Sequence, residues 1–219
     1  MHTKTVIILI SFFLLLSKAP SYAHAEDDNK FRFAVMGCMH LGVCNFKDYE
    51  LAIEKIKEYK PDFMLFLGGM VDPMVDKPVE SLWQRFDRIT EKLEVPVYDV
   101  LGNCKVTPFV SIPKDKIASM EKCFLDRYKK RYYSFEHKNN LFVVLDSEGF
   151  FKNPWNIPGV VKQTAFINEA LSQTEQYNNV FIALHDSFWL QDEQKSGLSL
   201  STRSSIKRQN GYSALIAIH

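Results

Sequence analysis

Three short apolar runs, each followed by glycine, alternate with two helical patterns in the first half of the chain, and this order constrains the fold most. The runs cover residues 31–36, 63–67 and 97–101, so each has the length of a buried strand and not of a buried helix. Between them, apolar residues recur at helical spacing at Tyr49, Ala52, Ile53, Ile56 and Tyr59, and again at Leu82, Phe86, Ile89 and Leu93. Apolar strands that alternate with helices are typical of parallel βαβ units whose sheet is covered on both faces.

The second half of the chain predicts a different kind of sheet. Residues 132–137 alternate (YYSFEH), and a short turn containing Asn139 joins them to the apolar run 141–146, a pattern typical of an antiparallel hairpin that leaves His137 at the surface. Further elements are expected as helices at 117–128 and through Phe166, Ala170 and Leu171, after a loop with Pro154 and Pro158, and as strands at 180–184 and 214–218. The sequence therefore predicts an α/β layered sandwich, in which parallel βαβ units are followed by a mixed or antiparallel sheet.

The first 25 residues have the pattern of a secretory signal peptide. Lys4 precedes an uninterrupted apolar run over residues 6–16, and the segment ends in Ala-His-Ala at Ala25. This run is shorter than the ~20 residues that a membrane-spanning helix needs, and a small-x-small ending is typical of a cleavage site. We expect cleavage after Ala25 and a protein that is secreted or periplasmic, with no membrane span after cleavage. An uncleaved N-terminal anchor is the alternative.

The remaining residues, 26–219, are predicted to form a single domain, since a chain of this length can bury a sizeable core. The whole sequence has 27 Lys and Arg residues and 26 Asp and Glu residues, and the signal segment removes two of the basic ones, Lys4 and Lys18. The charge that remains is close to neutral, which gives no electrostatic reason to expect nucleic acid or an anionic membrane as a partner.

Polar side chains collect where the predicted strands end. In layered α/β folds, ligands bind beyond the carboxyl ends of the strands, so the side chains at these positions form a candidate site. They are Cys38, His40, Asp72, Asn103, Cys104, Asp146, His185 and Asp186.

The order of these motifs resembles the calcineurin-like metallophosphoesterase family. That family has Asp-x-His after its first strand, Gly-Asp after the second, Gly-Asn-His after the third, a lone His after a later strand and Gly-His-x-His near the end. The corresponding stretches, within residues 31–189, are GCMH at 37–40, FLGGMVD at 66–72, LGNC at 101–104 and LH at 184–185. The resemblance implies a hydrolase of phosphate mono- or diesters, in which divalent metal ions (Mn, Fe or Zn) activate a water for attack on a small phosphate ester.

The resemblance carries three metal ligands over directly, namely His40, Asn103 and His185. Cys38 stands where the family has its first Asp, and Cys104 stands where it has the catalytic His that assists the leaving group or contacts the phosphate. The final Gly-His-x-His has no counterpart in the sequence, so the domain is expected to be incomplete at its C-terminus.

Gly69 stands where the family has the Asp that bridges the two metals, and it offers no ligand. Two divalent cations held ~3.5–4 Å apart repel each other, and a bridging anion offsets that repulsion. Asp72 lies three residues further on, at a position that the family often fills with Asp beside the site. The resemblance therefore predicts a degraded metal site that does not build the two-metal centre.

The cysteines at site positions leave three interpretations open. Cys38 and Cys104 are remnants of a lost site, which is the interpretation we favour. Alternatively they combine with His40 and His185 in an altered thiolate–imidazole metal site, or they form a disulfide, which an exported protein can keep.

Two classes of function follow. One is a phosphoesterase that acts on phosphate mono- or diesters outside the cytoplasm, and the other is a non-catalytic binding or scaffold module, a pseudoenzyme, on the same fold. The ligand set favours the second class, and a continuation of the chain to the missing motif would favour the first. The fold does not decide between them, because one fold hosts many functions.

Overall fold

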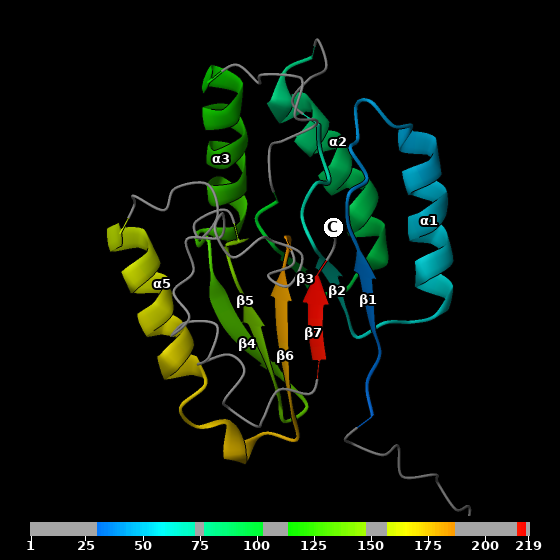
Figure 1. The fold of residues 1–219 in the computed structure, drawn as a ribbon. Coiled ribbons are helices and arrows are strands. Elements are labelled where there is room, and N and C mark those ends of the chain that lie inside the picture. The colour runs from blue at the N-terminus through cyan, green and yellow to red at the C-terminus, as the bar shows by residue number, and fades with distance from the viewer. Residues whose placement is uncertain (1–29, 73–76, 103–113, 148–156, 187–213, 218–219) are drawn as a thin grey trace, which may run out of the picture. The chain divides into compact units, whose positions relative to one another are not determined.

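The computed structural model describes residues 30–72, 77–102, 114–147, 157–186 and 214–217 (Figure 1). The chain divides into two units, Met1–Lys30 and Phe31–His219, and the elements described below belong to the second. The predicted signal segment, residues 1–25, lies outside the described residues. Across the described parts of the chain, no helix combines the length and the apolar character that crossing a membrane requires.

The first sheet has the βαβ order that the sequence predicts. Its strands are parallel, in the order β1 (Phe33–Met36), β2 (Phe63–Phe66) and β3 (Val97–Asp99). Helix α1 (Phe46–Glu58) follows β1, and helix α2 (Val79–Thr90), continued by the short helix η1 (Glu91–Leu93), follows β2. Each apolar run therefore becomes a strand, and each helical pattern becomes the crossover that parallel pairing requires.

The second sheet is mixed and contains β4 (Tyr133–His137), β5 (Asn140–Val144), β6 (Asn179–Leu184) and β7 (Ala214–Ala217), in that order. Strands β4 and β5 are antiparallel, whereas β5, β6 and β7 run parallel. The turn between β4 and β5 has positive φ at Lys138 (43°) and Asn139 (57°), a geometry that matches the twist of the flanking strands. The predicted hairpin and the predicted mixed sheet are both confirmed.

Two longer helices belong to the second half of the chain, α3 (Lys114–Tyr128) and α5 (Ile157–Ala170), together with the short helix η2 (Thr174–Gln176). The prediction placed Pro158 in a loop before α5, and this was wrong, because Pro158 lies in the first turn of that helix. Proline is tolerated there because the N–H that it lacks would have no helical partner.

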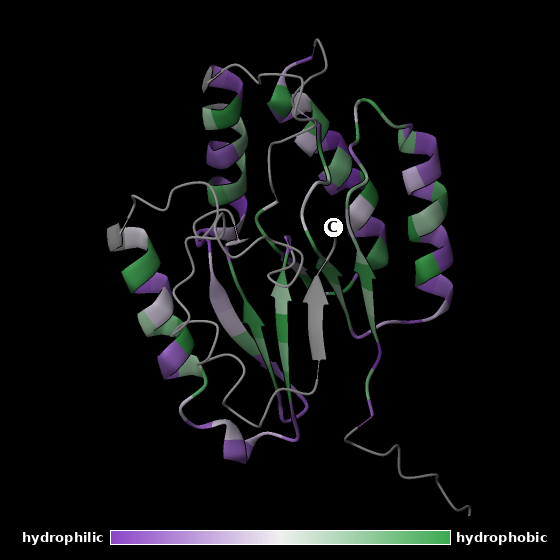
Figure 2. Ribbon diagram, in the orientation of Figure 1, coloured by the Kyte–Doolittle hydropathy of each residue, from purple (hydrophilic) through white to green (hydrophobic). Residues whose placement is uncertain are grey.

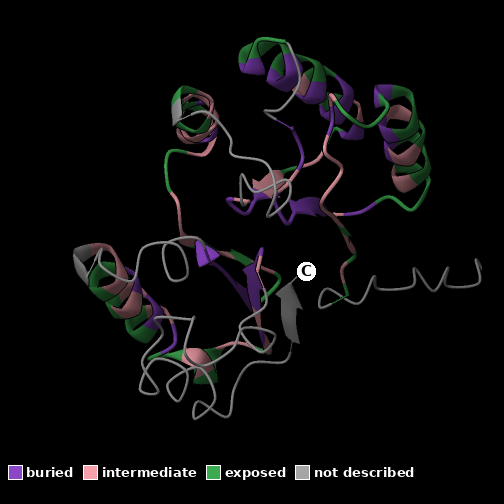
Figure 3. Ribbon diagram, turned by 45° about the horizontal axis from the view of Figure 1, so that its top comes forward, coloured by how far each residue is buried: buried purple, intermediate pink, exposed green. Residues whose placement is uncertain are grey.

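Strand β2 shows how one apolar run serves two cores. Met64 and Phe66 pack with the residues of α1 and α2, whereas Phe63, Leu65 and Leu67 pack against the second sheet. Successive side chains of a strand point to opposite faces, so both faces of the first sheet are buried. In Figures 2 and 3, β2 and β5 are largely apolar and buried, whereas the helices alternate between apolar, buried residues and hydrophilic, exposed ones.

The core between the two sheets is aromatic. Phe142 and Phe181 of the second sheet stack with their ring centroids 4.6 Å apart, and Phe63 of the first sheet meets Phe142 edge to face at 5.1 Å. On the opposite face of the second sheet, Ile167 and Leu171 pack against residues of β5 and β6. Two sheets with helices on their outer faces form the layered α/β sandwich that the sequence predicts.

A tyrosine from the second sheet fixes strand β3, the last strand of the described first sheet. The hydroxyl of Tyr133 accepts a hydrogen bond from the N–H of Asp99 and donates one to its carbonyl, both at 2.9 Å. These groups belong to a strand edge, where backbone donors and acceptors otherwise lack a strand partner. The end of β3, from which one loop of the candidate site leaves, is therefore anchored to β4.

Candidate functional site

The loops that follow β1 and β2 are paired along their backbones beyond the ends of the strands. The N–H groups of Cys38 and His40 donate to the carbonyls of Gly68 and Gly69, both at 2.9 Å, and the N–H of Asp72 donates to Leu41 at 3.0 Å. Because parallel strands deliver their carboxyl ends to one edge of the sheet, this pairing brings the first two predicted motifs together.

Glycine allows the loops that follow β2 and β3 to touch. A Cβ atom on Gly68 would lie 2.4 Å from Cα of Gly102, and one on Gly102 would lie 2.3 Å from the backbone nitrogen of Gly69. No side chain fits at either distance. Gly68 also has φ of +79°, a conformation that glycine adopts without strain. These two glycines therefore let the second and third motifs approach each other.

His185 joins this edge from the second sheet. It directly follows β6, is 4% exposed, and its Nδ1 lies 2.6 Å from the carbonyl oxygen of Leu67. A carbonyl oxygen only accepts, so Nδ1 carries the proton and Nε2 keeps its lone pair. An imidazole held by a backbone carbonyl in this way has the tautomer and orientation of a metal ligand.

His40 is oriented by Asp72. The Nδ1 of His40 lies 3.3 Å from Oδ2 of Asp72, a carboxyl that is 1% exposed, whereas the imidazole is one-third exposed. This contact does not have the geometry of a hydrogen bond, so the nearby negative charge favours a proton on Nδ1 but does not fix the tautomer. The backbone of His40 is left-handed, with φ of +45°, and histidine is one of the residues that tolerate this region. Asp72, which was expected beside the site, thus contacts one of the predicted site residues, His40.

Cys38 and Gly69 are the other two predicted site residues in the loops that follow β1 and β2. A Cβ on Gly69 would lie 3.1 Å from Cα of Cys38 and 3.4 Å from its Sγ, and the φ of Gly69 is +68°. Cys38 is a free thiol with a left-handed backbone, φ +54°. Burial raises the pKa of this thiol, and the negative charge of Asp186 raises it further. Both effects favour the neutral thiol over the thiolate, which is the form that acts as a nucleophile.

Two of the remaining predicted residues have structural partners. Nε of Arg131 lies 2.7 Å from Oδ2 of Asp146, and the side-chain amide of Gln163 bonds both backbone groups of Asp146, at 2.8 and 3.0 Å. The N–H of Asp186 donates to the hydroxyl of Ser147 at 3.0 Å. These contacts tie the ends of β5 and β6 to each other and to α5.

Asn103 and Cys104, the third motif, lie outside the described residues. Their roles as a metal ligand and at the position of the catalytic His stay predictions. The described part of that motif ends at Gly102, which lies against Gly68.

The strand-end motifs all fall within the match to one protein family. The family model for calcineurin-like phosphoesterases matches residues 31–209, which include every strand-end motif of the site. The chain belongs to this family. The family and the fold expected from the motif order are therefore confirmed.

Two solved structures have a related fold. GAP50, the anchor in the inner membrane complex of Plasmodium, matches with a TM-score of 0.52 and 13% identity, over 82% of this chain and 61% of that one. A dimetal phosphatase from Danio rerio matches with a TM-score of 0.55 and 13% identity, over 85% of this chain and 79% of that one. At such identity the likeness shows the fold alone, and this chain spans less than two thirds of the Plasmodium protein. No curated protein matches the sequence.

The family points to divalent metal use in general. Of the residues that could hold such an ion here, His185 has Nε2 left for a ligand, His40 lies beside Asp72, Gly69 has no side chain, and Cys38 is a free thiol. Within the described residues, no three His, Cys, Asp or Glu side chains gather in a group that could hold a metal ion.

Sequence reasoning missed the groups that orient the two histidines. The carbonyl of Leu67 has no sequence signal, since any residue supplies one. Asp72 had a signal, because it is a charged residue directly after a buried run, and the structure assigns it a partner in His40. The hydrogen bonds between the Tyr133 hydroxyl and β3 were also missed, because the sequence of an alternating strand does not indicate which group its tyrosine hydroxyl binds.

Proposed function

We propose that this chain is an exported, non-catalytic member of the calcineurin-like phosphoesterase family, which serves as a binding or scaffold module. The predicted signal segment at residues 1–25 supports export. The observation that carries the rest is the contact between Gly69 and Cys38, at the position where the family has its metal-bridging carboxylate.

The described residues do not fit a two-metal centre. A carboxylate at position 69 would need a left-handed backbone, and its Cβ would lie 3.1 Å from Cα of Cys38, so that Cys38 would have to shift. Without a bridging anion, two divalent cations at ~3.5–4 Å repel each other with nothing between them to offset the repulsion. Cys38 would have to lose its proton to supply that charge, and burial and Asp186 raise the pKa of its thiol.

The fold itself is suited to scaffolding. The two-sheet core is packed with aromatic side chains, and the backbone pairing of the strand-end loops requires no metal. One structural neighbour, GAP50, is an anchor in a membrane complex, which supports the use of this fold in assembly. Function cannot be transferred at 13% identity, so the analogy adds to the argument from Gly69 and Cys38 and does not replace it.

A specific observation favours a second candidate, a hydrolase of phosphate mono- or diesters. Nδ1 of His185 bonds the carbonyl of Leu67 and leaves Nε2 for a ligand, and Nδ1 of His40 lies beside the carboxylate of Asp72. Two histidines held in this way could bind a divalent metal, which would supply an activated water. Their role would be to hold and orient that ion.

Turnover of aryl phosphates separates the two candidates. We expect the chain, assayed with an aryl phosphomonoester and a diester in the presence of Mn²⁺, Zn²⁺ or Fe²⁺, to be no faster than its His185→Ala variant. Metal analysis of the same preparation is expected to find less than one equivalent of bound metal. Metal-dependent turnover that His185→Ala abolishes and Glu169→Gln, an exposed substitution on α5, leaves unchanged would overturn the proposal in favour of the hydrolase.

A further inference from the structure

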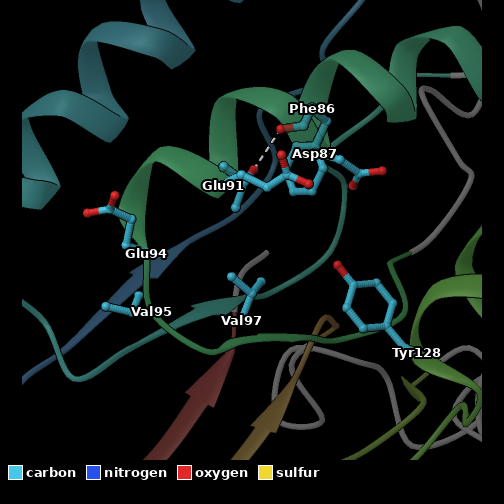
Figure 4. A pocket seen from close by; sticks show the side chains of 8 residues that line it. Phe86, Asp87, Glu91, Glu94, Val95, Val97 and Tyr128 are labelled. Carbon is cyan, nitrogen blue, oxygen red and sulfur yellow. Dashed lines mark hydrogen bonds between the residues drawn. The ribbon is translucent and has the colours of Figure 1, made fainter.

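A cavity of about 330 Å³ lies between α2, η1, the start of β3 and the end of α3 (Figure 4). Its volume falls at the lower end of the roughly 300–1,000 Å³ typical of small-molecule sites. The residues that line it are Phe86, Asp87, Thr90, Glu91, Glu94, Val95, Val97 and Tyr128. Val97 begins β3, whereas the strand-end site follows the other end of that strand, so the cavity is a separate place in the fold.

The cavity has apolar walls and an acidic rim. Phe86, Val95 and Val97 supply apolar surface, and Figure 4 shows the hydroxyl of Tyr128 pointing from α3 toward the space beside Val97. Three of the lining side chains are carboxylates and none is basic. This combination suits a ligand with an apolar body and a positive charge, and it disfavours an anion.

The basic residues around the rim neutralise only part of this charge. The guanidinium of Arg127 donates to both carboxylate oxygens of Asp87 at 2.6 to 3.2 Å, and Nζ of Lys57 lies 3.2 Å from the exposed carboxylate of Glu94. Among the described residues, Glu91 has no ion pair. Glu91 is therefore the rim carboxylate that is available to a bound cation.

A buried carboxyl, that of Asp99, lies behind the cavity wall. Asp99 is two residues after Val97 and so on the same face of β3. It is 1% exposed, and neither of its carboxyl oxygens has a hydrogen bond of good geometry within the described structure. Burial raises the pKa of Asp99 well above its usual range, while the nearby hydroxyl of Tyr128 acts to lower it. A pKa raised in this way favours the neutral form of the carboxyl, and a cation bound near Tyr128 would shift Asp99 back toward its ionised form.

We propose that this cavity binds a small organic cation, a protonated amine carried on an apolar or aromatic body. The ammonium group lies between the carboxylate of Glu91 and the hydroxyl of Tyr128. The body packs against Phe86 and Val97. This site is independent of the strand-end motifs and of whether they hydrolyse anything.

Three probes of equal size and different charge test the proposal on the full chain. 2-Phenylethylammonium, 2-phenylethanol and phenylacetate are titrated in turn and followed by the amide shifts of residues around the cavity. We expect the ammonium to bind at least ~10-fold more tightly than the alcohol, which corresponds to ~1.4 kcal/mol, and phenylacetate not to bind. Equal binding of the three probes, or binding of none, would overturn the proposal.

Two variants assign the binding to this cavity. Glu91→Gln removes an exposed charge and is expected to weaken ammonium binding ~3- to 10-fold, while Glu169→Gln, equally exposed on α5, leaves it unchanged. Val97→Phe fills the cavity and is expected to abolish binding of the ammonium, with a melting curve confirming that the variant folds. Ammonium binding that survives both Glu91→Gln and Val97→Phe would contradict the proposal, and the first variant decides it if the second does not fold.

Discussion

The two parts of the strand-end site hold their residues by different means. In the first part, His40 and His185 are oriented through Nδ1, by the carboxylate of Asp72 and by the carbonyl of Leu67. In the second part, a Cβ on Gly69 would lie only 3.1 Å from Cα of Cys38, and both residues have left-handed φ values. The first part keeps the geometry of ligand side chains, whereas the second is packed closed.

This difference separates the groups that bring the loops together from the groups that orient the site side chains. The loops meet through Gly68 and Gly102, whose approach depends on missing Cβ atoms and not on metal ligands. The histidines are oriented by groups that belong to the fold, one a backbone carbonyl and the other a buried carboxyl.

Restoring the family's bridging carboxylate is expected to have the largest effect. Gly69→Asp places a side chain 3.1 Å from Cα of Cys38 on a backbone with φ of +68°. Left-handed strain and overpacking together should lower the free energy of unfolding by about 2–4 kcal/mol, measured by urea denaturation. The matched control is Asn139→Asp, which introduces the same group at an exposed turn residue with φ of 57° and should change stability by less than about 0.5 kcal/mol. A Gly69→Asp variant as stable as the control would show that the second part is not packed closed.

Removal of the Asp72 carboxylate tests the part that contains the histidines. Asp72→Ala should lower the free energy of unfolding by about 1–3 kcal/mol, since it leaves a void and removes the contact to His40. Imidazole ¹⁵N shifts should report a protonated Nδ1 on both histidines in the native protein, and a shift of His40 toward the Nε2–H tautomer in the variant. His185 serves as the internal control, because its partner is the carbonyl of Leu67. An unchanged His40 tautomer would show that Asp72 does not orient it.

The sequence predicted the strands well because each is a short apolar run closed by glycine. Residues 63–67 read as one strand, and the structure places its residues alternately in the helix-side core and the inter-sheet core. The family followed from motif order, since Gly37, Gly68 and Gly102 mark the strand ends that carry the site. Apolar runs and strand-end glycines are local signals, and they do not depend on which metal ligands the sequence contains.

Contacts between distant segments could not be predicted in the same way. The hydrogen bond from His185 to Leu67 joins residues 118 positions apart, through a backbone atom that has no sequence signature. His137, expected at the surface, lies with its ring 5.2 Å from those of both Phe31 and Phe63 and its Nε2 3.4 Å from Asp62. The side chain is 26% exposed, so the prediction holds only in part, because alternation along β4 indicates which residues share a face and not what covers that face.

The smallest expected effect concerns the thiol of Cys38 and is measured as a rate. Burial and the charge of Asp186 both raise the pKa of this thiol, so at pH 8 less of it is thiolate than of an ordinary cysteine. Alkylation by iodoacetamide, resolved by peptide mass spectrometry, should therefore be slower at Cys38 than at the exposed Cys44. Asp186→Asn removes the negative charge, lowers the pKa of Cys38 and should speed its alkylation roughly two- to fivefold, with Cys44 unchanged. Alkylation of Cys38 as fast as that of Cys44 in the native protein would mean that a reactive thiolate is present. It would then rank with the two histidines as a side chain available for chemistry, and the contrast between the two parts of the site would no longer hold.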